Sequence, residues 1–192
     1  MGFQNREVGN FYSGRELEVD VLGKPKFPPA YEVAYRRLAH EKGGYLPYHQ
    51  AQALIREFNP DDPTNPKQDF ARDARLAICD ALELDEEDMD SVKFYSAVGT
   101  ALDIYHGVDG WFEIDCEDLK AGHLHAEVSL DVTKRADKLD EGHKADVMIG
   151  DVAAPDDEAY LTEVDKYAGE ITRVMIERIL AAGERKVLVG AR

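Results

Sequence analysis

The clearest pattern along the chain is a strict alternation of apolar and polar residues over positions 123–133. The apolar positions are Leu124, Ala126, Val128, Leu130 and Val132. A period of two is typical of a β-strand with one buried face and one polar face. Residues 108–114 alternate in the same way, and the polar stretch 115–122 between the two segments is predicted to be a hairpin loop. The pattern therefore predicts an antiparallel pair of strands.

The polar faces of these two strands carry several acidic side chains. With the strands paired antiparallel and their faces matched, one register places Asp109 opposite Ser129. Asp131 is then the diagonal neighbour of Asp109 on the same face. We therefore expect two carboxylates to converge near the open end of the hairpin. Glu113 and Glu127 lie nearer the loop, where we expect them to face solvent.

Helical periodicity and turn residues predict the remaining elements. Helices are expected over residues 31–42, 48–58, 66–82 and 155–182, and further short strands over 92–97, 145–149 and 186–190. Asn65 followed by Pro66 is typical of a helix start, and Gly183 is typical of a helix end. This order of elements predicts an α/β fold with a mixed central sheet of four to five strands, flanked by helices.

The length of 192 residues is that expected for a single domain. Residues 1–29 are rich in glycine and proline, which indicates an N-terminal arm or irregular extension, although 15–22 could form a short strand. We expect residues 30–64 to form a helical lead-in and residues 66–190 to form the core. The arm or the long C-terminal helix could pair in a homodimer.

The chain is strongly acidic, with a formal net charge of −16 and a pI of about 4.7. Proteins that bind nucleic acid usually present a basic stripe. The charge is therefore also consistent with a solvated acidic surface, or with a surface that mimics DNA. Basic residues gather around the second strand, at Lys134, Arg135, Lys138 and Lys144. A basic cleft, if present, is expected there.

Several classes of protein lack support in the sequence. It has no P-loop, no GxGxxG and no GxSxG motif, which argues against nucleotide-cofactor and hydrolase-elbow chemistry. No apolar run approaches the length of a membrane span, and the first residues lack a signal-peptide core. Cys79 and Cys116 form no CxxC pair. These features predict a cytoplasmic protein with free thiols and no membrane association.

Two short motifs coincide with the predicted hairpin. GVD ends at Asp109, and SLDVTK runs from Ser129 to Lys134. Over roughly residues 66–150 the pattern resembles the core of the PD-(D/E)XK nuclease superfamily. That family places an acidic residue at the start of one strand, then Asp or Glu, any residue, and Lys on the next. The resemblance implies a restriction endonuclease-like fold and metal-dependent hydrolysis of phosphodiester bonds in DNA.

The chemistry implied by the resemblance needs a hard divalent cation. Mg²⁺ or Mn²⁺ polarises the phosphate and activates water, and such ions prefer oxygen ligands. Asp109 and Asp131 would hold the ion between adjacent strands. The backbone carbonyl of Val132, at the middle position of the motif, could supply a further ligand. A nearby lysine would orient the water or stabilise the developing negative charge.

The sequence departs from the family pattern at this lysine. Thr133 stands two residues after Asp131, and on a regular strand Lys134 points to the opposite face. A bulge could turn Lys134 inward, or Lys144 could reach the site from just before the next strand, which we favour slightly. In a third alternative the site has lost its lysine and is inactive.

Two residues that precede Asp109 are further candidates. His106 could contact the phosphate or take part in proton transfer, although a loop histidine with a structural hydrogen bond is the alternative. Asp103 could join the acidic site. The sequence thus predicts a DNA nuclease. A catalytically inactive nuclease-fold protein acting in binding or assembly, and an acidic interaction protein that mimics DNA, remain as alternatives.

Overall fold

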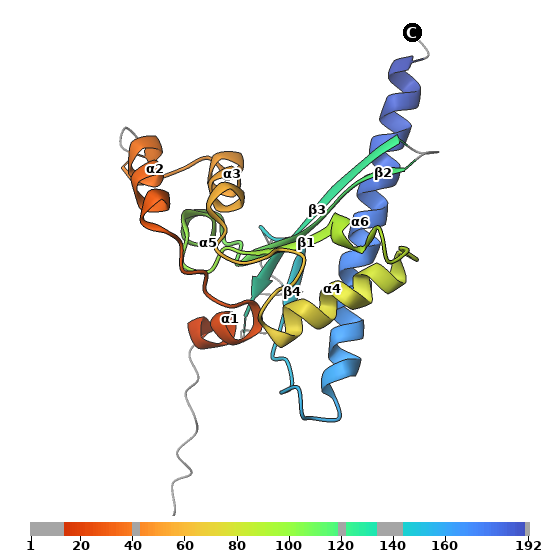
Figure 1. The fold of residues 1–192 in the computed structure, drawn as a ribbon, viewed down its shortest axis with the longest axis horizontal. Coiled ribbons are helices and arrows are strands. Elements are labelled where there is room, and N and C mark those ends of the chain that lie inside the picture. Colours follow the sequence, from red (N-terminus) through yellow and green to blue (C-terminus); the bar gives the residue numbers. More distant parts are fainter. Residues whose placement is uncertain (1–13, 40–42, 119–121, 134–143, 191–192) are drawn as a thin grey trace, which may run out of the picture.

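The computed structural model describes residues 14–39, 43–118, 122–133 and 144–190. This part of the chain forms six α-helices and a four-stranded sheet flanked by helices, as Figure 1 shows. The helices are α1 (Gly14–Leu22), α2 (Pro29–Ala39), α3 (Tyr48–Phe58), α4 (Asp69–Ala81), α5 (Ala101–His106) and α6 (Tyr160–Gly190). The strands are β1 (Val92–Ser96), β2 (Gly110–Asp118), β3 (Gly122–Val132) and β4 (Val147–Ile149), and a short 3-10 helix, η2 (Met89–Ser91), precedes β1.

The sheet is mixed and has the strand order β1-β2-β3-β4. The first three strands form an antiparallel meander, and β4 pairs parallel with β3. The predicted α/β class is therefore confirmed, with the sheet at the lower end of the expected four to five strands. No helix in the described residues is both long and apolar enough to cross a membrane.

The register of the central hairpin differs from the predicted one. Trp111 lies opposite Ser129, and Gly110 lies opposite Leu130. Asp109 lies just before the paired residues of β2, and its N–H donates to the carbonyl of Leu130. The expected register was wrong by two residues, because the strands continue to 118 and start again at 122 and so shorten the connection. A slip of two residues preserves the faces within the paired strands.

One face of the sheet packs against α1, α4 and α6. Alternate strand residues supply this core, as the period of two requires. They are Val92, Phe94, Phe112, Ile114, Ala126, Val128, Leu130, Val132, Val147 and Ile149. Helix α6 adds Val164, Ala168, Ile171 and Met175, which recur at the three- and four-residue steps predicted for this helix.

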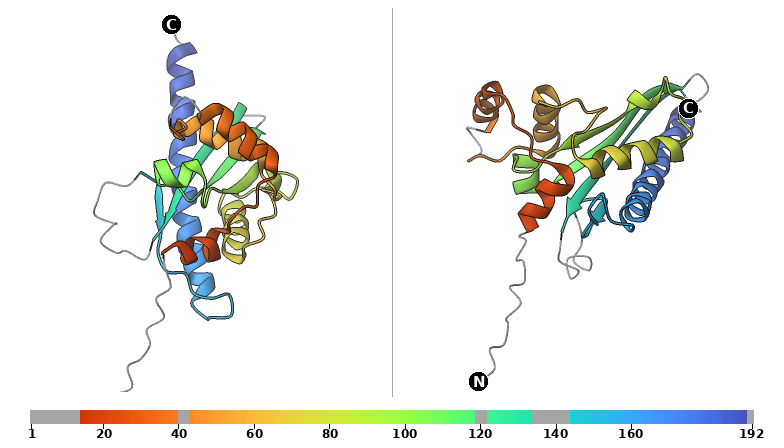
Figure 2. Two further views of the ribbon diagram at one scale, coloured as in Figure 1. Left: turned by 90° about the vertical axis from the view of Figure 1, so that its left-hand side faces the viewer. Right: turned by 60° about the horizontal axis from the view of Figure 1, so that its bottom comes forward.

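The opposite face is covered by α2, α3 and α5, so that helices lie on both sides of the sheet (Figure 2). Trp111 is completely buried there and stacks on Tyr95, with ring centroids 4.8 Å apart. The expectation that Glu113 faces solvent was wrong, because it is only 5% exposed beneath α3. An alternating strand does not reveal whether its polar face meets water or a second layer of the same chain.

The largest differences from the predicted elements lie near the ends of the chain. Residues 14–22 form α1, so a short strand there was wrong. Helix α6 runs on to Gly190, so the strand predicted over 186–190 was wrong as well.

Two further differences lie in the middle of the chain. Helix α4 starts at Asp69 with Gln68 as its N-cap, three residues after the predicted start. The short helix α5 was not predicted.

Candidate metal site

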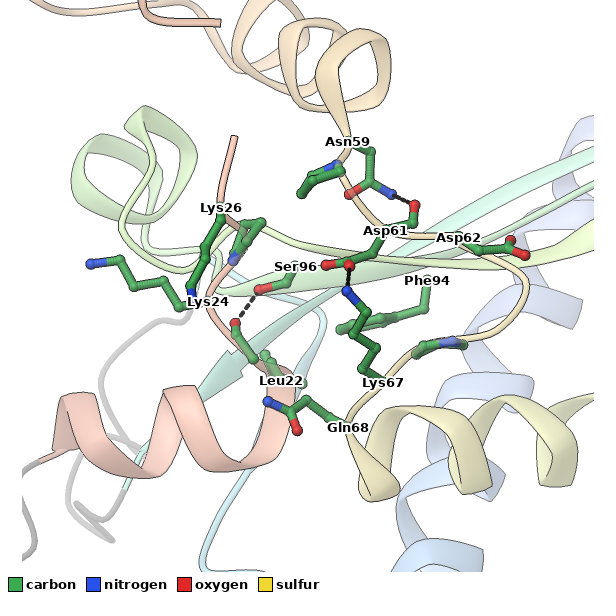
Figure 3. A pocket seen from close by; sticks show the side chains of 14 residues that line it. Leu22, Lys24, Lys26, Asn59, Asp61, Asp62, Lys67, Gln68, Phe94 and Ser96 are labelled. Carbon is green, nitrogen blue, oxygen red and sulfur yellow. Dashed lines mark hydrogen bonds and ion pairs between the residues drawn. The ribbon is translucent and has the colours of Figure 1, made fainter. Parts of the chain in front are cut away.

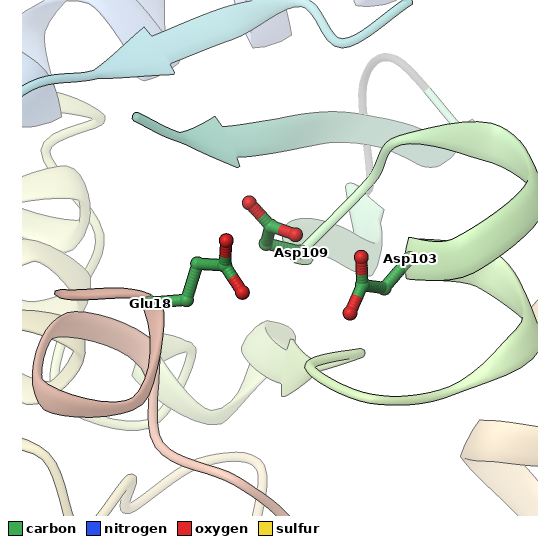
Figure 4. Close-up of side chains that lie close together, drawn as sticks. All are labelled: Glu18, Asp103 and Asp109. Atoms are coloured by element: carbon green, nitrogen blue, oxygen red, sulfur yellow. The ribbon is translucent and has the colours of Figure 1, made fainter. Parts of the chain in front are cut away.

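Three carboxylates meet at the end of the sheet where β2 begins (Figure 4). Glu18 comes from α1, Asp103 from α5, and Asp109 from the residue just before β2. One carboxylate oxygen of each lies within 4.8 Å of the others, which is the spacing of groups that can share one ion. Carboxylate oxygens are the ligands that Mg²⁺, Mn²⁺ and Ca²⁺ prefer.

Asp109 is held by main-chain hydrogen bonds on both of its peptide groups. Its N–H donates to the carbonyl of Leu130 at 2.8 Å, and its own carbonyl accepts from Ala97 N–H at 2.7 Å. Its Oδ2 accepts a further hydrogen bond from the N–H of Val132 at 2.7 Å. The side chain is therefore locked between β2 and the end of β3, and it is only 4% exposed.

Helix α5 places Asp103 through a capped first turn. Thr100 is the N-cap, and its hydroxyl accepts from Leu102 N–H at 3.2 Å. Asp103 Oδ2 accepts from Gly99 N–H at 2.7 Å. Gly99 and Gly107 have φ of +81° and +64°, a region that favours glycine, and so the chain can turn sharply at both ends of this short helix.

Helix α1 brings Glu18 to the site from the other side. Leu17, Val21 and Leu22 lie on one face of α1 and are buried in the core beside the sheet. Glu18 projects from the adjacent part of this helix toward Asp109, as Figure 4 shows. The position of Glu18 thus depends on the docking of α1, a segment far from Asp109 in sequence.

The environment of Asp109 disfavours its charged form. Burial, the largest cause, raises the pKa of the Asp109 carboxyl to about 8, and the hydrogen bond from Val132 N–H acts in the opposite direction. The neighbouring charges of Glu18, Asp103 and Asp131 raise the pKa further. A divalent cation would reverse this balance, because it favours the ionised form of every carboxylate around it.

Asp131, the second predicted ligand, lies near this cluster without belonging to it. It pairs with Met148 of β4 and is partly exposed. Its charge contributes to the raised pKa of Asp109, so the two carboxylates interact electrostatically. The structure therefore brings Asp109 and Asp103 of the predicted residues into one cluster, with Asp131 beside it.

Three further residues of the motif, at positions 132–134, follow Asp131 in the sequence. Val132 contacts Asp109 through its N–H, while a role for its carbonyl stays a prediction. Thr133 donates its N–H to the carbonyl of Ile149 at 2.8 Å and so continues the pairing with β4. Lys134 lies outside the described residues.

Cationic side chains lie close to both ends of α5. Lys144 is exposed, and its Cδ lies 3.7 Å from the position that a Cβ would occupy on Gly107, two residues before Asp109. At the other end, a Cβ on Gly99 would lie 3.6 Å from Lys24 Nζ and 3.7 Å from Arg15 Nη2. Lys24 and Arg15 were not predicted as site residues.

His106 is engaged away from the carboxylates. Its Nε2 lies 2.8 Å from the carbonyl of Leu46, and because a carbonyl only accepts, this nitrogen donates. Its ring packs against Tyr45 and Tyr48. The arrangement favours the structural alternative for this histidine, and its role in proton transfer stays a prediction.

Glu18 was missed because residues 1–29 were interpreted as an arm. One signal was available, since Leu17, Val21 and Leu22 follow the spacing of an apolar helix stripe. Comparison of the chain with protein-family models, curated proteins and solved structures gave no match. The resemblance to PD-(D/E)XK nucleases therefore rests on the sequence motifs alone.

Proposed function

We propose that the protein is a divalent-metal-dependent nuclease that hydrolyses phosphodiester bonds in DNA. The observation that carries the proposal is the set of three converging carboxylates of Glu18, Asp103 and Asp109, with the charge of Asp131 acting on Asp109. Three acids held this close, one of them buried, are costly to ionise without a cation. A bound divalent cation would offset this free-energy cost.

Each residue has a definite part in this proposal. Asp109 and Glu18 would ligate Mg²⁺ or Mn²⁺ with Asp103 or Asp131, and the ion would polarise the phosphate and lower the pKa of a bound water. Val132 N–H keeps the Asp109 carboxylate oriented. Thr133 occupies the position of the family's lysine.

A cation near the site is needed to stabilise charge on the phosphate. Two of the described lysines lie at the ends of α5, the helix that carries Asp103. Lys144 lies beside Gly107, and Lys24 lies beside Gly99. The net charge of −16 makes long-range attraction of DNA weak, so we expect binding to depend on these local cations and on the metal.

The first test is a calorimetric titration with Mn²⁺ at pH 6.5 and pH 8.5. Wild type should bind, and should bind more tightly at the higher pH, because ligation must displace the proton of Asp109. Asp109→Asn preserves the acceptor for Val132 N–H but removes the charge, and should abolish binding. Asp156→Asn, an exposed acid before α6, is the matched control and should bind as wild type does.

Cleavage of labelled DNA in Mg²⁺ or Mn²⁺ completes the test. We expect Asp109→Asn and Asp131→Ala each to lower the rate at least 100-fold, with Asp156→Asn unchanged. Cleavage that survived both substitutions would contradict the proposal.

A second candidate function is a nuclease-fold protein that binds without cleaving. The observation that favours it is Thr133 at the lysine position. It predicts Mn²⁺ binding that requires Asp109, together with no cleavage of any nucleic acid by the wild type.

A further inference from the structure

A hollow of about 320 Å³ opens between three segments of the chain (Figure 3). These segments are residues 22–26 after α1, residues 59–68 between α3 and α4, and the β1 residues Phe94 and Ser96. This volume is at the lower end of pockets that hold small organic ligands. No residue proposed above as a metal ligand lines it.

Part of the wall of the hollow is apolar and stiff. Leu22, Pro25, Pro60, Pro66 and Phe94 all line it. Proline has a fixed φ and no N–H group, so the proline positions have little freedom to lose on binding and present no backbone donor. Such a surface is suited to a flat group with apolar faces, as a nucleobase has.

Polar groups in the hollow are already held in place by the protein. Ser96 Oγ donates to the carbonyl of Gly23 at 2.5 Å, and Asn59 Nδ2 donates to the carbonyl of Asp61 at 2.8 Å. Gln68 packs against Gly23, whose φ of +76° admits this turn. The lining is thus organised before any ligand arrives.

The charged side chains that line the hollow are three lysines and two aspartates, with a net charge of +1. Asp61 is paired with Lys67, and the Asp62 carboxylate accepts two hydrogen bonds within its own loop. Lys24 and Lys26 are both exposed, and neither makes an ion pair within the described part of the chain. These two ammonium groups are available to bind an anionic group.

Lys24 also connects the hollow to the carboxylate cluster. Its side chain extends from the rim toward α5, as Figure 3 shows, and its Cε lies 3.1 Å from a Cβ position on Gly99. The N–H of Gly99 is the group that donates to Asp103. An anion on Lys24 would therefore lie next to the metal ligands.

We infer that this hollow is a subsite for one nucleotide of a DNA strand, adjacent to the phosphodiester held at the carboxylate cluster. The base lies among the prolines over Phe94, and its phosphate is bound by Lys24 and Lys26. The inference rests on the proposed function and adds a substrate class. Since a base must leave the duplex stack to enter a pocket, the subsite selects single-stranded DNA.

The test measures binding without catalysis. A fluorescent single-stranded 12-mer is titrated with protein in EDTA, by anisotropy, at several salt concentrations. The Lys24→Ala/Lys26→Ala variant should bind at least 10-fold more weakly than wild type. The salt slope should become shallower by about 0.7 for each phosphate that the variant no longer neutralises. Lys166→Ala, an exposed lysine on α6, is the control of matched chemistry and should bind as wild type does.

Two further strands test recognition of the base. The wild type should bind a 12-mer with abasic residues, and a duplex of the same sequence, each several-fold more weakly than the normal single strand. Equal affinity for the abasic and normal strands would overturn the subsite, as would wild-type affinity in the double lysine variant. A mononucleotide and inorganic phosphate serve as competitors of the labelled strand. If phosphate displaced the strand as effectively as the mononucleotide did, the hollow would bind only an anion, and the inference would be contradicted.

This experiment separates failure of the subsite from failure of the proposed function. Strand binding that requires Lys24 and Lys26, without metal-dependent cleavage, would retain the subsite and reject the nuclease. Metal-dependent cleavage that is unchanged in the double variant would retain the nuclease, with Lys144 and not Lys24 as its cation, and reject the subsite.

Discussion

The stability of the metal-free protein and the binding of a metal favour opposite protonation states of Asp109. In the unfolded chain its carboxyl has an ordinary pKa near 4, whereas in the fold burial and the neighbouring acids raise the pKa to about 8. Between these values the folded state holds a proton that the unfolded state has released. The free energy of unfolding of the metal-free protein should therefore fall as pH rises from about 4 to about 8.

Asp109→Asn is predicted to remove this dependence and stabilise the metal-free protein at pH 8.5. The amide retains an acceptor for Val132 N–H but never becomes charged. Each unit by which the two pKa values differ corresponds to about 1.4 kcal/mol. We expect the free energy of unfolding at pH 8.5 to rise by roughly 2–4 kcal/mol. Urea unfolding in EDTA at pH 5 and pH 8.5 measures it. A variant no more stable than wild type at pH 8.5 would contradict the burial argument.

Helix α3 is attached to the sheet by a network of charged groups around Arg56. Arg56 Nη2 and Nε lie 2.7 and 2.9 Å from Glu113 Oε2, and Arg56 also pairs with Glu127. Gln52 of the same helix donates to Glu127 at 2.8 Å, and Trp111 Nε1 lies 3.3 Å from Glu113 Oε2. This network explains how two acids facing one another across β2 and β3 can be covered by a helix.

Arg56→Ala is predicted to destabilise the protein by about 3–5 kcal/mol, because it leaves Glu113 buried without its charge partner. The double variant Arg56→Ala/Glu113→Gln should recover part of this loss. Arg36→Ala, which breaks an exposed ion pair with Glu32 on α2, should cost less than about 1 kcal/mol. Urea unfolding of the wild type, Arg56→Ala, Glu113→Gln and the double variant measures the coupling, with Arg36→Ala as the control, and strictly additive effects would show that Arg56 and Glu113 act independently.

At the scale of the whole molecule, the candidate site joins segments that are far apart in the chain. Glu18 reaches it from α1, while Asp103 and Asp109 follow β1 about 85 to 90 positions later in the sequence. The site is therefore complete only when α1 is packed on the core through Leu17, Val21 and Leu22. Undocking of this one helix would remove a ligand without unfolding the sheet.

Leu17→Ala tests this dependence. Truncation of a buried leucine should lower the free energy of unfolding by about 2 kcal/mol or more, and should also weaken Mn²⁺ binding, because α1 holds Glu18 in place. Leu161→Ala removes an exposed leucine on α6 and should change neither quantity. Calorimetry with Mn²⁺ beside urea unfolding gives both readouts. Unchanged Mn²⁺ affinity in a destabilised Leu17→Ala would contradict the dependence of the metal site on the packing of Leu17.

The sequence by itself determined the elements whose residues alternate or recur at a helical period. The strands around residues 110 and 130, the helix over 48–58 and most of α6 follow from such patterns, and with them the α/β class. It also located Asp109 and Asp131, because short motifs lie within predicted strands. Local periodicity is a property of consecutive residues and can be recognised without the rest of the fold.

Only the tertiary structure decided which groups meet. The burial of Glu113 depends on α3, the register of the hairpin depends on the true length of its strands, and Glu18 enters the site through the packing of α1. These are contacts between residues distant in sequence, and no local pattern encodes which partner covers a polar face. Two of the three carboxylates of the candidate metal site, Asp103 and Asp109, were accordingly named from the sequence, and the third, Glu18, comes from the fold.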